Sequence, residues 1–70
     1  MTREALANLP KEHKKQLDFF KEDLRRFKGN KNAAETEREK NIIKGYLKCL
    51  VTSEIITVIE YRALLLYYMD

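Results

Sequence analysis

Apolar residues near the start of the chain follow the spacing of one helix face. They recur at i, i+3, i+7 and i+10, as an amphipathic helix requires, in the series Leu17, Phe20, Leu24 and Phe27. Pro10 suits the first turn of such a helix, and Gly29 followed by Asn30 suits its C-terminal stop. We predict a helix at about 10–28. Residues 2–8 add a short helical turn that covers one end of it.

A second helix is predicted at about 33–52. Asn32 and Glu35 have the spacing of a capping box at its start. Residues 35–40 are polar on all sides, so we expect this half to be solvated. The other half carries an apolar arc that covers about 180° of the helix, made of Ile42, Ile43, Tyr46, Leu47, Leu50 and Val51. Gly45 lies opposite this arc, on the polar side.

The third predicted helix, at about 58–69, is apolar on nearly every side. Thr57 and Glu60 form a second capping box ahead of it, with Ile56 placed to act as a hydrophobic staple. One face suits the core, namely Tyr61, Leu64, Leu65 and Tyr68. The other face carries Ile59, Ala63 and Leu66, with Tyr67 at one flank. A helix that is apolar all round must be covered all round, so this second face predicts an oligomer or partner interface. The alternative is burial within the monomer by the first helix and the N-terminal turn.

These elements define the expected fold class. Short connections between successive helices favour antiparallel neighbours, so we expect one all-α domain at 1–70, either a three-helix bundle or a helical hairpin with a third arm. A 70-residue chain buries only about 60% of its unfolded surface. Its single cysteine excludes an internal disulfide, so helix packing and oligomerisation are the expected sources of further stability.

Charge is unevenly distributed along the chain. The net charge is +3; residues 1–31 contribute nine basic against five acidic residues, or +4, and residues 32–70 five against six, or −1. The N-terminus lacks the pattern of a signal peptide, and the apolar window at 58–69 is shorter than the roughly 20 residues of a membrane span. With a lone cysteine, these features predict a cytoplasmic protein without a membrane partner.

The chain offers little material for catalysis. One histidine, His13, and one cysteine, Cys49, cannot supply a nucleophile, a base and an orienting group. We expect His13 at the solvated end of the first apolar seam, Cys49 as a packing residue, and the glutamates on a solvated face, namely Glu35, Glu37, Glu39, Glu54 and Glu60. The prediction is a non-enzymatic protein with no cofactor, no metal and no small-molecule substrate.

Two features of the first helix suggest binding. A basic stripe lies within about 60° of the helical wheel and could follow a phosphate backbone; it consists of Lys14, Lys21, Arg25 and Lys28. Asp18 interrupts this stripe, and an i, i+4 pair such as Glu22 with Arg26 would make it an ordinary solvated face. Phe19 points away from the apolar seam and has the form of an interface anchor.

The C-terminal segments carry a resemblance. Residues 45–50, GYLKCL, and residues 55–64, IITVIEYRAL, resemble the C-terminal helical hairpin of small proteins carried by bacteriophages and mobile elements of Gram-positive bacteria. The resemblance implies an accessory or host-modulating binder and carries over no active site. We therefore predict a helical protein–protein interaction module with regulatory or inhibitory action by occlusion. The alternative is a nucleic-acid-binding protein that uses the basic first helix.

Overall fold

The computed structural model describes residues 2–69, which form an all-α fold as predicted. The helices are α1 (Thr2–Asn8), α2 (Lys11–Gly29), α3 (Ala33–Thr52) and α4 (Val58–Met69). The N-terminal turn is thus a helix of its own, and the described chain has four helices rather than three. Helix α2 begins at Lys11 and not at Pro10, whose carbonyl accepts the amides of His13 and Lys14 at 3.0 Å.

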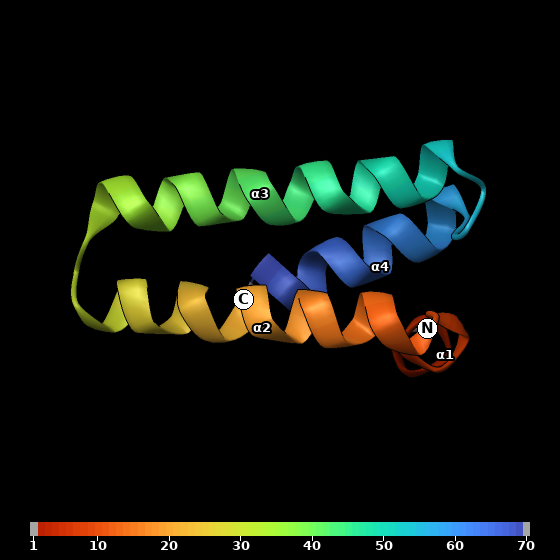
Figure 1. The fold of residues 1–70 in the computed structure, drawn as a ribbon, viewed down its shortest axis with the longest axis horizontal. Coiled ribbons are helices and arrows are strands. Elements are labelled where there is room, and N and C mark those ends of the chain that lie inside the picture. Colours follow the sequence, from red (N-terminus) through yellow and green to blue (C-terminus); the bar gives the residue numbers. More distant parts are fainter. Residues whose placement is uncertain (1, 70) are drawn as a thin grey trace.

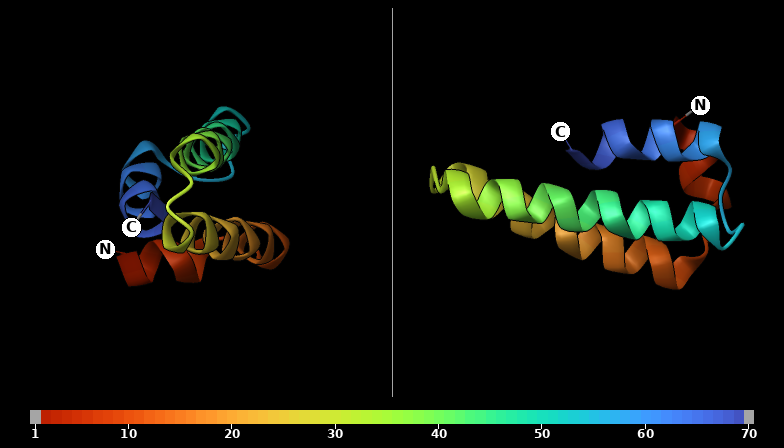
Figure 2. Two further views of the ribbon diagram at one scale, coloured as in Figure 1. Left: turned by 90° about the vertical axis from the view of Figure 1, so that its left-hand side faces the viewer. Right: turned by 90° about the horizontal axis from the view of Figure 1, so that it is seen from above.

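The three longer helices pack as a bundle. Helices α2 and α3 run antiparallel along the long axis, and α4 crosses behind them (Figure 1). Seen along this axis, α2, α3 and α4 lie at the corners of a triangle, with α1 across the end formed by the starts of α2 and α4 (Figure 2). The overall extents are 34 × 20 × 19 Å. Within residues 2–69, no helix is long and apolar enough to cross a membrane.

The turn between α2 and α3 differs from the predicted one. Gly29 was predicted to adopt the left-handed conformation at the end of the helix, but it is the last helical residue of α2. The left-handed conformation is adopted instead by Lys31, with φ 55°. The predicted cap of α3 is present in part, since the Asn32 side chain accepts the amide of Glu35 at 3.1 Å. The return bond of the box is absent, because the Asn32 amide donates to the carbonyl of Phe27 at 3.0 Å and the Glu35 carboxylate pairs with Arg38 at 3.6 Å.

The predicted capping box of α4 is confirmed in both directions. The Thr57 amide donates to Glu60 Oε1 at 2.8 Å, and the Glu60 amide donates to Thr57 Oγ1 at 3.1 Å. The bond from the Thr57 amide lowers the pKa of Glu60, because it favours the charged carboxylate. Asn8 of α1 donates to the second Glu60 oxygen at 3.3 Å. The cap therefore also fixes α1 against the start of α4.

The core lies between α2, α3 and α4. Its fully buried side chains are Leu17, Leu24, Ile43, Leu47, Leu64 and Tyr68, all of them on the predicted apolar faces. Phe20 and Phe27 of the predicted α2 seam are half-buried. Ile42 was predicted to belong to the core arc, but it is exposed. An apolar arc of about 180° is wider than the strip that two neighbouring helices can cover.

Two further predictions about α3 are wrong. Glu39 was expected on a solvated face, yet its side chain is buried. It faces Asp23 and Arg26 of α2, and burial, followed by the charges of Asp23 and Glu35, raises its pKa. Cys49 was expected to pack at the edge of the core, yet it is exposed.

Candidate functional site

The outer face of α4 exposes large apolar side chains, as its sequence predicts. Ile59 is 62% exposed and Leu66 is 73% exposed. The two residues flank a hollow of about 330 Å³ between α1 and α4, which is lined by Thr2, Ile59, Arg62, Ala63 and Leu66. Leu64 and Tyr68 occupy the opposite side of the helix and hold it in the core. The exposure of Ile59 and Leu66 is therefore a consequence of how α4 is anchored.

The rest of this predicted face is partly covered within the chain. Ala63 is half-buried and packs against the core, so the prediction that it has no cover is wrong. Tyr67 lies on the flank that faces α2, where the Lys21 ammonium sits 4.2 Å from its ring centroid. The Tyr67 ring also makes an edge contact with Tyr68, with 4.9 Å between centroids. The exposed face of α4 is thus narrower than predicted and is centred on Ile59 and Leu66.

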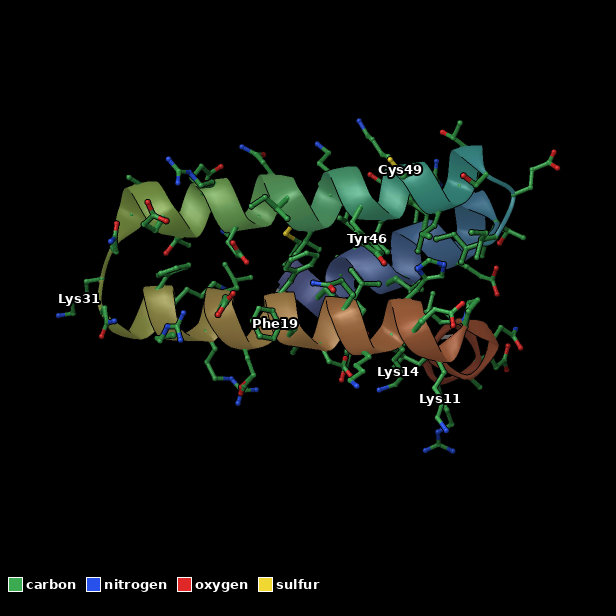
Figure 3. The ribbon with its side chains drawn as sticks, in the orientation of Figure 1. Lys11, Lys14, Phe19, Lys31, Tyr46 and Cys49 are labelled. Carbon is green, nitrogen blue, oxygen red and sulfur yellow. The ribbon has the colours of Figure 1, made fainter. Side chains whose placement is uncertain are left out.

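Phe19 does not join this face. Its side chain is 61% exposed on α2 and is visible on the near side of the bundle (Figure 3). Two residues along a helix differ by about 200°, so Phe19 points away from Leu17, which is fully buried in the core. Phe19 and the α4 face therefore lie on different sides of the molecule and cannot contact one flat partner surface together.

The cations of the basic stripe of α2 form contacts with other groups of the protein. Lys21 donates to the backbone carbonyl of Tyr67, and Lys28 donates to that of Met69 at 3.0 Å. These carbonyls belong to the last turn of α4, where backbone oxygens lack helical partners and the helix dipole favours positive charge. Two lysines of the stripe thus cap the C-terminal end of α4, a contact between distant segments that the sequence pattern did not indicate.

The other two cations of the stripe pair along their own helix. Lys14 binds Asp18 at 2.8 Å, and this bond and the charge of Asp18 raise the pKa of Lys14. Arg25 lies 3.5 Å from Glu22 with both side chains exposed. Arg26 pairs with Asp23 at 2.9 Å, so the predicted pair of Glu22 with Arg26 does not form. A hollow of about 130 Å³ lies along the stripe, lined by Lys21, Leu24, Arg25 and Lys28.

Asp18 connects the stripe to the core. Its Oδ1 atom accepts a hydrogen bond of 2.9 Å from the hydroxyl of Tyr68, while its Oδ2 atom binds Lys14. Burial, followed by the bond to Asp18, raises the pKa of Tyr68 well above its usual range, so this hydroxyl remains a donor. Sequence reasoning treated Asp18 as an interruption of the stripe. The structure shows that it is the acceptor that satisfies the one polar atom of a fully buried tyrosine.

A third hollow lies along the second half of α3, beside the start of α2. It measures about 460 Å³ and is lined by His13, Asn41, Ile42, Gly45, Tyr46, Cys49, Leu50, Ser53 and Ile55. A Cβ atom built on Gly45 would meet no atom within 4 Å, so this glycine leaves open space and is not needed for a close contact. His13 Nδ1 lies 2.8 Å from the Tyr46 hydroxyl, and Figure 3 shows Tyr46 directed toward α2.

Among residues 2–69, no three His, Cys, Asp or Glu side chains come together as metal ligands. Comparison of the chain with models of protein families, with curated proteins and with solved structures finds no match. The resemblance to accessory proteins of phages and mobile elements therefore stays a prediction.

Proposed function

We propose that this protein is a non-enzymatic protein–protein interaction module that self-associates through the outer face of α4 and regulates or inhibits by occlusion. The observation that carries the proposal is the exposure of Ile59 and Leu66 beside an apolar hollow. Monomeric proteins seldom expose contiguous apolar surface of this kind without a binding role. In a protein this small, occupying a partner's surface is an activity that needs no catalytic group.

A symmetric pair of α4 helices would cover this face. Ile59 and Leu66 are seven residues apart, which is about 10.5 Å along the helix axis. In an antiparallel pair with Ala63 near the two-fold axis, Ile59 of one copy packs on Leu66 of the other. Such an isologous contact closes after two copies, and the small side chain of Ala63 lets the two backbones approach each other.

The engagement of the basic stripe favours this proposal over nucleic-acid binding. A phosphate backbone would have to compete with the α4 carbonyls for Lys21 and Lys28, and with Asp18 for Lys14. Among the cations of the stripe, Arg25 has the longest contact to its partner, 3.5 Å to Glu22. Arg25→Glu therefore tests the alternative without removing a contact to α4. Nanomolar binding to DNA or RNA that falls with added salt and is lost in this variant would establish the alternative instead.

Sedimentation equilibrium over a micromolar to millimolar concentration range tests self-association directly. We expect a dimer or a higher oligomer for the native chain and a single 8.4 kDa species for Leu66→Glu, because the added charge would be buried in the interface. Ile42→Glu is the matched control, since it introduces the same charge at an exposed apolar position of α3. A native chain that stays at 8.4 kDa at millimolar concentration would refute the proposal.

A further inference from the structure

A second row of cations lies on α3, and its environment differs from that of the α2 stripe. Lys40, Lys44 and Lys48 recur every four residues, and the sequence from 40 to 53 contains no acidic residue. Within the described chain, none of these lysines takes part in an ion pair. Each cation of the α2 stripe, by contrast, has a partner in the protein. The charge of this α3 row is therefore left unneutralised by the chain.

Such a row is locally unfavourable for the helix. Like charges at i, i+4 repel each other, and here two successive pairs do so over a length of about 12 Å. Acidic residues at neighbouring positions would remove the repulsion, as Asp18 does for Lys14 on α2. A binding partner that carries negative charge would remove it equally well.

An apolar hollow lies at one end of the row. It measures about 270 Å³ between α3 and α4 and is lined by Lys48, Val51, Thr52, Val58 and Tyr61. Val58, at the start of α4, is 56% exposed. On the helical wheel all three lysines fall within about 60° of Val51, so the row runs along the edge of α3 that borders α4. Cations and an apolar hollow thus form one surface, which we call the α3 edge.

We propose that the α3 edge binds an acidic amphipathic helix of a partner protein. Carboxylates repeated every four residues on that helix have the same axial spacing of about 6 Å as the lysines. An apolar side chain beside them would enter the hollow next to Val58 and Tyr61. This inference goes beyond self-association, because Arg62 separates the α3 edge from Ile59 and Leu66 on the helical wheel of α4.

The hollow favours a protein partner over a nucleic acid. Phosphates could also neutralise Lys40, Lys44 and Lys48, but a nucleic-acid backbone has no apolar group to place against Val51 and Val58. An amphipathic helix offers both the charge and the apolar side chain in one element. We therefore assign the α3 edge to the helix and use an oligonucleotide as the competing ligand in the test.

The probe is a fluorescent helical peptide of about five turns, with glutamates every four residues and leucines on the adjacent flank, titrated by fluorescence anisotropy. We expect saturable binding by the native chain and at least about a tenfold loss of affinity in Lys44→Glu/Lys48→Glu, because two attractive contacts become repulsive. Lys11→Glu/Lys15→Glu is the matched control. It changes the net charge equally at two exposed lysines of α2 that make no ion pair within the described chain, and it should bind nearly as the native protein does.

Val58→Asp tests the apolar half of the surface and should also weaken binding, while circular dichroism confirms that each variant is folded. Equal losses in the two double variants would overturn the proposal, because they would reflect net charge alone. Failure to saturate with the peptide would also overturn it, as would an oligonucleotide of equal charge that binds through Lys44 and Lys48 more tightly than the peptide does. Leu66→Glu, which should abolish self-association, should retain peptide binding. The peptide test therefore succeeds or fails independently of the test of self-association.

Discussion

The contact between Tyr68 and Asp18 offers a sharp test of how α4 is held against α2. Tyr68 is fully buried, and its hydroxyl donates to Asp18 Oδ1 at 2.9 Å. Tyr68→Phe keeps the ring in the core and removes only this hydrogen bond. A bond to a charged acceptor contributes about 1.5–3 kcal/mol. The Asp18 side chain is 44% exposed, so water can replace the lost donor, and we expect a decrease in stability of about 1 kcal/mol.

Urea denaturation followed by circular dichroism measures this decrease. The unfolding free energy of a domain this small should be about 3–10 kcal/mol, so the midpoint should shift clearly while the slope stays constant. Tyr67→Phe is the matched control on the next residue, where no hydrogen bond of the hydroxyl is found within the described chain, and it should change stability by less than about 0.5 kcal/mol. Measurements at two protein concentrations separate the effect from self-association.

A double-mutant cycle with Asp18→Ala assigns the energy to the pair. The coupling between the two substitutions should be about 1 kcal/mol, and the loss of the exposed bond between Asp18 and Lys14 should add less than about 0.5 kcal/mol. If Tyr68→Phe left the stability unchanged, or if the coupling were zero, the hydroxyl would not depend on Asp18. Helix α4 would then be held against α2 by contacts other than this hydrogen bond.

Three further predictions concern α3 and its N-terminal turn. Leu47→Ala should lower the free energy of unfolding by about 2–5 kcal/mol, because Leu47 is fully buried; an unchanged melting temperature would contradict the packing. Lys31→Gly should stabilise by about 0.5 kcal/mol in urea denaturation, since Lys31 has φ 55°; a loss of stability would contradict this. Burial raises the pKa of Glu39 in the folded state above the ordinary glutamate value of about 4.5. The native state therefore loses stability as the pH rises from the ordinary pKa through the raised one. Glu39→Gln should thus stabilise the protein at pH 7 and not below about pH 4.5. Glu37→Gln, at an exposed position of the same helix, is the control. If Glu39→Gln raised the stability equally at both pH values, ionisation of the buried Glu39 would not be the cause.

The local patterns of the sequence determined most of the secondary structure. Helix spacing and capping residues act over four or fewer positions, so they can be recognised without knowing the fold. The reciprocal cap of Thr57 and Glu60 and the buried faces around Leu24 and Leu64 agree with these patterns. The exposure of Ile59 and Leu66 on α4 was also predictable, because a helix that is apolar all round cannot be fully covered by so short a chain.

Only the tertiary structure decided which polar side chains are buried or form hydrogen bonds and ion pairs with other parts of the protein. From the sequence, the α2 stripe could be a phosphate-binding surface. In the fold, its Lys21 and Lys28 donate to the last carbonyls of α4. In the same way, Glu39 is buried because α2 packs over it, while Lys44 and Lys48 on the same helix make no ion pair within residues 2–69. A hydrogen bond or ion pair depends on the position of a partner distant in sequence. Periodicity along one helix specifies which face a side chain occupies, but not which group of another helix will meet it.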